Sequence, residues 1–158
     1  MKEDKFDIKK EYSKLVKKYK LPSFKEMDEE FNIGSIQENG FLLKGVRSKI
    51  FEKIDSFVKL IDSYLYPSNA GVAVLYEIKY LSKEDLEIFE DLYRKMMIVM
   101  RENDLLDLDV SETKDAEFIK NSYKQWQQIK KQLYNTMKKV RDSWNKKGDL
   151  PTDKAYFG

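Results

Sequence analysis

Three lysines near the end of the chain recur at seven-residue intervals, a spacing that suits contact with phosphate groups. Lys124, Lys131 and Lys138 share one face of a helix, with steps of about 10.5 Å along its axis. Such a row of cations can neutralise successive phosphates of a nucleic acid. Residues 114–147 contain ten basic and three acidic residues, so this face is the candidate RNA- or DNA-binding surface.

The segment just before this basic face offers a second interpretation of its charge. Residues 83–112 contain four basic and ten acidic residues. Two helices joined by a short connection pack antiparallel, so the opposite charges could be matched within the chain. Lysine also outnumbers arginine 26 to 4, and arginine is the residue that binds phosphate or guanine with paired hydrogen bonds. The sequence favours a solvated basic face and leaves nucleic-acid binding as the alternative.

An acidic stretch, "DLDVSETKDAEF", begins like a calcium-binding loop with Asp107, Asp109 and Ser111. Its sixth position is Glu112 where the calcium loop needs glycine, and its twelfth is Phe118 where the loop needs a bidentate glutamate. We therefore expect no metal site here, and we find no motif for a cofactor.

The chain has no histidine and no cysteine, which removes the most common catalytic groups. No Ser–His or Cys–His pair can form, and no thiolate is available as a nucleophile or metal ligand. We therefore expect a protein that is not an enzyme.

The absence of cysteine and of a signal peptide favours a cytoplasmic location. The 30 basic and 28 acidic residues nearly cancel, and no apolar run is long enough to span a membrane.

The elements that position these groups are predicted to be helices. Apolar residues from Leu43 to Leu65 recur every three or four positions, which predicts a central helix over residues 41–66, about 39 Å long. Residues 72–81 suit either a strand or a short buried helix, and we favour the helix because no second strand is available. Further helices are expected at residues 3–20, from Ser23 onwards, and at residues 83–103 and 114–147.

The last predicted helix places both tryptophans on its apolar face. Ile119, Tyr123, Trp126, Leu133, Met137, Val140 and Trp144 follow each other at steps of three, four or seven residues. This spacing favours Trp126 in the core over Trp126 as an exposed base-stacking platform. The helix is longer than its predecessor, so we expect Val140 and Trp144 to pack on the N-terminal helix or on a partner chain.

We expect one helical domain at residues 1–147 and a tail at residues 148–158. The tail carries Tyr156 and Phe157, two aromatic residues that could enter a groove of a partner or fold back on the domain. Together these patterns predict an all-α bundle of five to six helices with a long C-terminal helix.

The stretches "LPSFKEMDEEFNI", "FLLKGVRSKIFEKI" and "AEFIKNSYKQWQQIKKQL" resemble an uncharacterised family of small all-helical archaeal proteins. The resemblance implies a cytoplasmic archaeal helical protein and brings no catalytic residue with it. We expect a protein-interaction or scaffold module whose partner is another protein or a second copy. Nucleic-acid binding is the alternative, and nothing in the sequence indicates a membrane partner.

Overall fold

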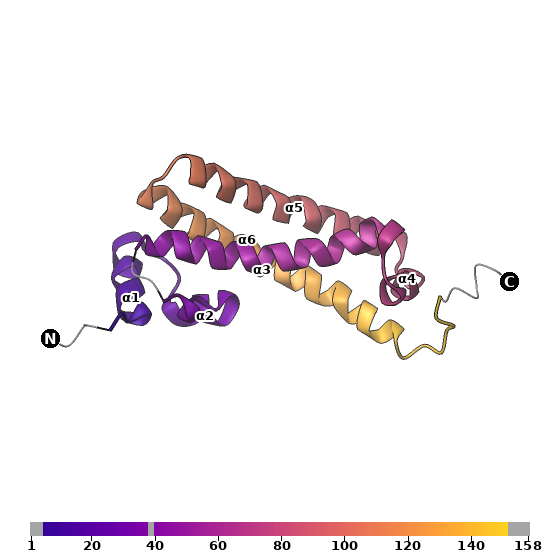
Figure 1. The fold of residues 1–158 in the computed structure, drawn as a ribbon. Helices are drawn as coiled ribbons and strands as arrows, with labels where there is room; N and C mark the ends of the chain where they lie inside the picture. The colour runs from indigo at the N-terminus through magenta and orange to yellow at the C-terminus, as the bar shows by residue number, and fades with distance from the viewer. Residues whose placement is uncertain (1–4, 38–39, 152–158) are drawn as a thin grey trace. The chain divides into compact units, whose positions relative to one another are not determined.

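In the computed structural model, residues 5–37 and 40–151 are described, and every regular element among them is a helix. Figure 1 shows the helices in chain order. The α-helices are α1 (Ile8–Tyr19), α2 (Phe24–Phe31), α3 (Leu42–Leu65), α4 (Val72–Ile78), α5 (Lys83–Leu108) and α6 (Glu112–Ser143), with 3₁₀ turns η1 (Ile33–Ser35) and η2 (Pro67–Asn69). The predicted all-α fold with a long C-terminal helix is confirmed, as is the helical interpretation of the segment that forms α4.

The chain divides into two compact units, and each contains parts of the three longest helices. Unit 1 comprises Met1–Asp55 and Ile98–Trp126, and unit 2 comprises Ser56–Met97 and Gln127–Gly158. The boundaries fall inside α3, α5 and α6, which therefore contribute to both units. The single domain expected over residues 1–147 stays a prediction.

Local capping chemistry fixes the first two helices of unit 1. The Asp7 carboxylate accepts a hydrogen bond from the backbone N–H of Lys10 at 3.2 Å and starts α1. Ser23 and Glu26 form a reciprocal capping box at the start of α2, as their spacing predicts. The apolar faces of these helices then place Tyr12, Met27 and Phe31 in the core.

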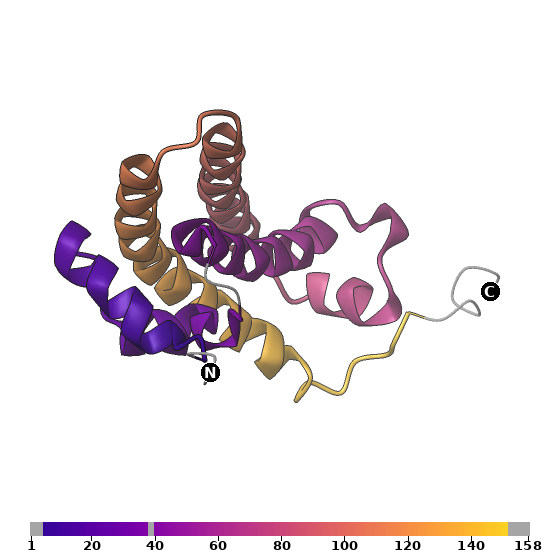
Figure 2. The same cartoon turned by 60° about the vertical axis from the view of Figure 1, so that its left-hand side comes forward.

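The connection between α5 and α6 is shorter than the sequence predicts. The helix expected to end near residue 103 continues to Leu108, so only residues 109–111 separate it from α6. Figure 2 shows this short loop. Ser111 begins α6 by accepting a hydrogen bond from the backbone N–H of Lys114 at 3.3 Å. Most of residues 104–113, which lie between the two predicted helices, therefore belong to the end of α5 or the start of α6.

In unit 2, the short helix α4 is anchored by polar groups on its buried side. The buried Glu77 carboxylate accepts hydrogen bonds from the Tyr64 hydroxyl and from the Trp144 indole N–H, the latter at 2.8 Å. The hydroxyl of Tyr76 lies 2.8 Å from the carbonyl oxygen of Ser143 and 2.6 Å from that of Lys146. The Ser143 carbonyl, at the last residue of α6, also accepts the backbone N–H of Lys146 at 3.1 Å, so Tyr76 of α4 fixes the turn that ends α6.

Candidate interaction site

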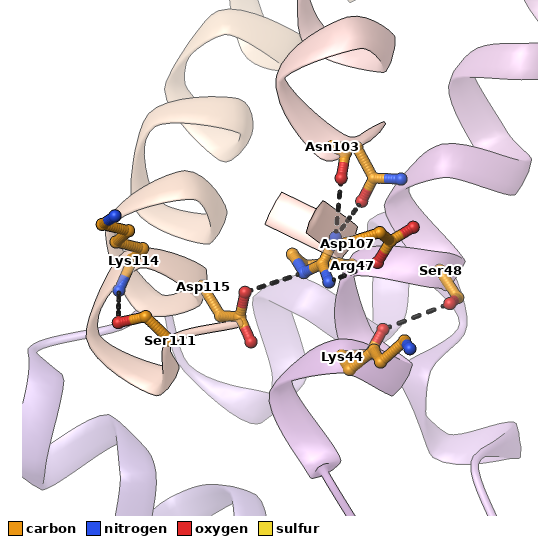
Figure 3. A network of polar contacts seen from close by, with 8 residues as sticks. All are labelled: Lys44, Arg47, Ser48, Asn103, Asp107, Ser111, Lys114 and Asp115. Atoms are coloured by element: carbon orange, nitrogen blue, oxygen red, sulfur yellow. Dashed lines mark hydrogen bonds and ion pairs between the residues drawn. The ribbon is translucent and has the colours of Figure 1, made fainter. Parts of the chain in front are cut away.

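The most highly organised polar cluster in unit 1 surrounds the buried guanidinium of Arg47, on α3. Its Nη1 donates to the backbone carbonyl and side-chain oxygen of Asn103, at 3.1 and 2.7 Å, and Nη2 donates to Asp107 at 2.8 Å. Its Nε lies 3.0 Å from a carboxylate oxygen of Asp115, at the start of α6. Figure 3 shows how one cation joins the end of α5 to the start of α6. These contacts hold the last turns of α5, from Asn103 to Asp107, to Arg47 on α3.

The electrostatics of this cluster are unbalanced, because one cation faces two carboxylates. Burial raises the pKa of Asp115 above its ordinary value, and the positive charge of Arg47 only partly offsets this effect. The nearby charges of Asp107 and Glu112 raise this pKa further. The Asp115 side chain is 9% exposed, whereas the Asp107 side chain is 47% exposed and shares its charge with solvent.

Asp115 also lines a groove of about 400 Å³ on unit 1. The groove lies between α1, the start of α3 and the α5–α6 loop, and its apolar wall includes Leu15, Leu42 and Leu43. Two further apolar residues at the groove are open to solvent: Phe41 is 80% exposed and Val110 is 72% exposed. A groove edged by solvent-exposed large apolar side chains has the character of a protein-interaction site.

The backbone of Phe41 is strained at the edge of this groove. Its φ of 49° lies in the left-handed region, which a bulky residue other than glycine rarely adopts. The conformation places Phe41 directly before α3, where its ring is exposed. Strained residues of this kind cluster at functional sites, where binding can compensate for the local energetic cost.

The charged groups along the groove are largely satisfied within unit 1. Lys14 forms an ion pair with Glu11 at 2.9 Å, both on α1. Glu112 accepts hydrogen bonds from the Tyr19 hydroxyl at 2.5 Å and from Lys18 at 3.1 Å, and both contacts lower its pKa. Apart from Lys44, whose charge acts on Asp115, the charged groups of the groove have partners within unit 1, so the groove offers mainly apolar surface to a ligand.

The three lysines of the predicted basic face are all exposed on α6. Lys124 belongs to unit 1, whereas Lys131 and Lys138 belong to unit 2. Lys131 lines a shallow polar cavity with the amide side chains of Gln128, Gln132 and Asn135. Lys138 lies 5.7 Å from the ring centroid of Tyr134, which is itself 64% exposed. Their common spacing on one helix is as predicted, and the structure shows no further element that gathers them.

The expected pairing of α5 acids with α6 bases is seen between Asp85 and Lys139, which lie 2.6 Å apart. Asp107 of α5 pairs with Arg47 of α3 at 2.8 Å, and further ion pairs lie within α5, such as Arg94–Glu90 at 2.8 Å and Lys95–Asp91 at 2.8 Å. Most of the excess acidic residues of segment 83–112 and of the excess basic residues of segment 114–147 therefore face solvent.

The residues predicted to contact a partner have different environments. Val140 is 4% exposed, so its apolar surface is already covered. Trp144 stacks on Tyr76 with ring centroids 4.5 Å apart, so its cover comes from α4 and differs from the predicted N-terminal helix or partner chain. Trp144 keeps 46% exposure, and a partner contact there stays a prediction. Tyr156 and Phe157 lie outside the described residues.

The sequence analysis missed Arg47 and Phe41, for different reasons. Arg47 lies four residues after Leu43 and three before Ile50, within the apolar stripe, and this position is the signal that could have indicated a buried cation. Phe41 follows Gly40 and precedes an apolar stripe, so it was assigned to the helix itself. Of the two acids that bind Arg47, the incomplete calcium loop singles out only Asp107, while Asp115 lies in the same acidic stretch. This acidic stretch does bind a cation, but the cation is the guanidinium of Arg47 and not a metal ion.

Comparisons with protein-family models, with curated proteins and with solved structures find no match. The resemblance to the archaeal helical family therefore stays a prediction. No helix among the described residues has both the length and the apolar character that crossing a membrane requires. Within the same residues, no three acidic side chains converge in a way that could hold a metal ion.

Proposed function

We propose that this chain is a non-enzymatic, cytoplasmic protein-interaction module whose groove on unit 1 binds an apolar segment of another protein. The observation that carries the proposal is the exposure of Phe41 and Val110, at 80% and 72%, along one groove. Exposed apolar side chains that gather at a hollow are typical of interaction sites, where a few buried anchors supply most of the affinity.

The charges around the groove indicate the chemistry of its occupant. Glu11, Glu112 and Asp115 each have a cationic or hydroxyl partner within unit 1. A ligand that buried its own charge here would have to compete with those partners and pay for desolvation. We therefore propose an uncharged apolar anchor, such as a leucine or phenylalanine, flanked by polar residues that stay in solvent.

Short peptides selected from a random display library against the intact chain provide the test. We expect the enriched peptides to share an apolar anchor and to lose affinity about tenfold for Val110→Asp, because that change places a charge in the groove. Phe41→Asn should also weaken binding while retaining the fold, because asparagine tolerates the left-handed backbone better than phenylalanine does.

Tyr66→Asp is the matched control, because Tyr66 is 78% exposed and belongs to unit 2. It should leave the affinity of every selected peptide unchanged. The proposal is wrong if no peptide is enriched, or if Tyr66→Asp weakens binding as much as Val110→Asp does. Light scattering distinguishes a second copy as the occupant: self-association that Val110→Asp abolishes would replace the proposed foreign segment.

Nucleic-acid binding by the basic face of α6 is the second candidate, favoured by the exposure of Lys124, Lys131 and Lys138. We expect the triple change of these lysines to glutamate to abolish RNA or DNA binding and its steep salt dependence without unfolding the chain. Absence of binding to single- or double-stranded RNA or DNA at low salt would exclude this candidate.

A further inference from the structure

A second, smaller cavity on unit 1, of about 250 Å³, brings lysines from two elements together. Lys20 comes from the end of α1, while Lys120 and Lys124 lie one helical turn apart on α6. Tyr123 and Pro22 complete the lining used in this argument. The cavity thus combines three cations with one aromatic ring.

The wall of this cavity on the α1 side is held rigidly. The hydroxyl of Tyr12 donates a hydrogen bond to the Pro22 carbonyl at 2.8 Å, and the Tyr12 ring is fully buried. Leu21, between Lys20 and this anchor, is 6% exposed. The backbone from Lys20 to Pro22 is therefore preformed, and ligand binding has to order only the side chains that line the cavity.

Lys20 occupies a backbone position that lysine does not favour. It ends α1 in the left-handed conformation, with φ 56° and ψ 46°, where glycine or asparagine is the usual choice. A lysine here places a cation beside the carbonyl end of the helix, which is favourable for the helix dipole. It also directs that cation to the edge of the cavity, where an anion would gain from it.

The balance of charge at the cavity is positive. Glu26 is the one carboxylate in its lining, and the Glu26 side chain accepts the backbone N–H of Ser23 at 2.8 Å in the capping box. Lys120 pairs with Glu117 at 2.6 Å. Lys20 and Lys124 have no ion-pair partner among the residues that the structure describes, so both are available to an anion.

We propose that this cavity binds the phosphate group of a nucleotide unit. Lys20 and Lys124 contact the phosphate oxygens, Lys120 adds longer-range attraction, and the sugar or base lies against Tyr123 and Pro22. Phosphate oxygens are strong acceptors for ammonium groups, and aromatic side chains are the common surface on which bases stack. The inference is independent of the apolar groove, and it shares only Lys124 with the predicted row of lysines on α6.

The same chemistry could come from a free nucleotide or from a nucleic-acid backbone, so the experiment uses both. Binding of uridine monophosphate, a short single-stranded RNA and inorganic phosphate to the intact chain is measured by calorimetry at low salt. The variants are Lys20→Asn, which suits the left-handed backbone, and Lys124→Gln. Lys9→Gln is the control, because it removes another exposed lysine, from α1, at a position that does not line the cavity.

We expect Lys20→Asn and Lys124→Gln each to weaken binding about tenfold, as the loss of a charge-assisted hydrogen bond predicts, while Lys9→Gln changes it less than twofold. Binding of uridine monophosphate that follows this pattern identifies a free nucleotide as the ligand. Binding of RNA alone, with the same pattern, identifies a nucleic-acid backbone.

Three outcomes overturn the proposal. None of the three probes binds at low salt; Lys9→Gln weakens binding as much as Lys20→Asn; or RNA binding depends on Lys131 and Lys138 and is unaffected by Lys20→Asn. Thermal melts check that each variant is folded, and Lys20→Asn should melt no lower than the unmodified chain. Val110→Asp should leave nucleotide binding unchanged, which separates failure here from failure of the groove.

Discussion

At the scale of single residues, Arg47 is the side chain on which the turn between α5 and α6 most depends. Arg47→Met should lower the free energy of unfolding by about 3–5 kcal/mol, because it leaves the buried carboxylate of Asp115 without its cation. Denaturant unfolding followed by circular dichroism measures the loss. Asp107→Asn is the milder control, with an expected loss under about 1 kcal/mol, since Asp107 is 47% exposed.

A paired change separates the cost of an unpaired charge from the cost of lost packing. Arg47→Met combined with Asp115→Leu should recover part of the stability that Arg47→Met loses, because both buried charges are then gone. If the double variant is less stable than Arg47→Met alone, the ion pair does not explain the importance of Arg47.

Trp126 is the second residue whose role the structure makes testable. Its indole is 1% exposed, its ring centroid lies 6.1 Å from that of Phe31, and its N–H donates to Glu30 at 2.7 Å. Trp126→Ala should therefore cost about 3–5 kcal/mol. Trp144→Ala is the comparison and should cost less, because 46% of Trp144 remains exposed. A loss under about 1 kcal/mol for Trp126→Ala would contradict its place in the core.

At the scale of elements, the start of α5 is joined to α6 by the ion pair between Asp85 and Lys139. Although burial opposes ionisation of Asp85, hydrogen bonds and charge attraction from Lys139, with hydrogen bonds from Ser82, hold its pKa below the ordinary value of 3.8. A depressed carboxyl pKa stabilises the fold above the pKa of the unfolded chain, and this contribution is lost as pH falls through the folded-state pKa.

Asp85→Asn should lower stability at pH 7 by about 1 kcal/mol, a modest value because the Lys139 side chain is 61% exposed. The amide can still accept the backbone N–H of Ser82, so the helix start is preserved. The difference between the variant and the unmodified chain should shrink as pH falls below about 4. A difference that is constant between pH 7 and pH 3 would show that the charge of Asp85 does not matter.

The helices also show which structural features can be predicted from the sequence and which cannot. Capping pairs such as Ser23–Glu26 and Ser82–Asp85 were predictable, because donor and acceptor lie within one turn of each other. The cover of Trp144 by α4 was not predictable, because it depends on contacts between residues 67 positions apart, as in Trp144–Glu77. The contact between Asn103 and Arg47 was equally hidden, because these residues lie 56 positions apart.

At the scale of the whole molecule, the amino-acid composition excludes several kinds of catalytic chemistry but does not indicate a function. The absence of histidine and cysteine in 158 residues leaves carboxylates, lysines, tyrosines and hydroxyls as reactive groups. The row of lysines on α6 was visible in the sequence, yet Lys20 joins Lys124 only through the fold. The apolar groove was equally hidden, since Leu15, Phe41 and Val110 come from three separate segments.

The proposal that this chain binds an apolar segment of another protein is tested most directly by amide NMR of the intact protein titrated with a selected peptide. We predict that the signals which shift most belong to Leu15, Phe41, Leu43 and Val110, the residues that line the groove. Signals of Lys131 and Lys138 on α6 should stay in place. Shifts centred on those lysines, with the groove unaffected, would contradict the account.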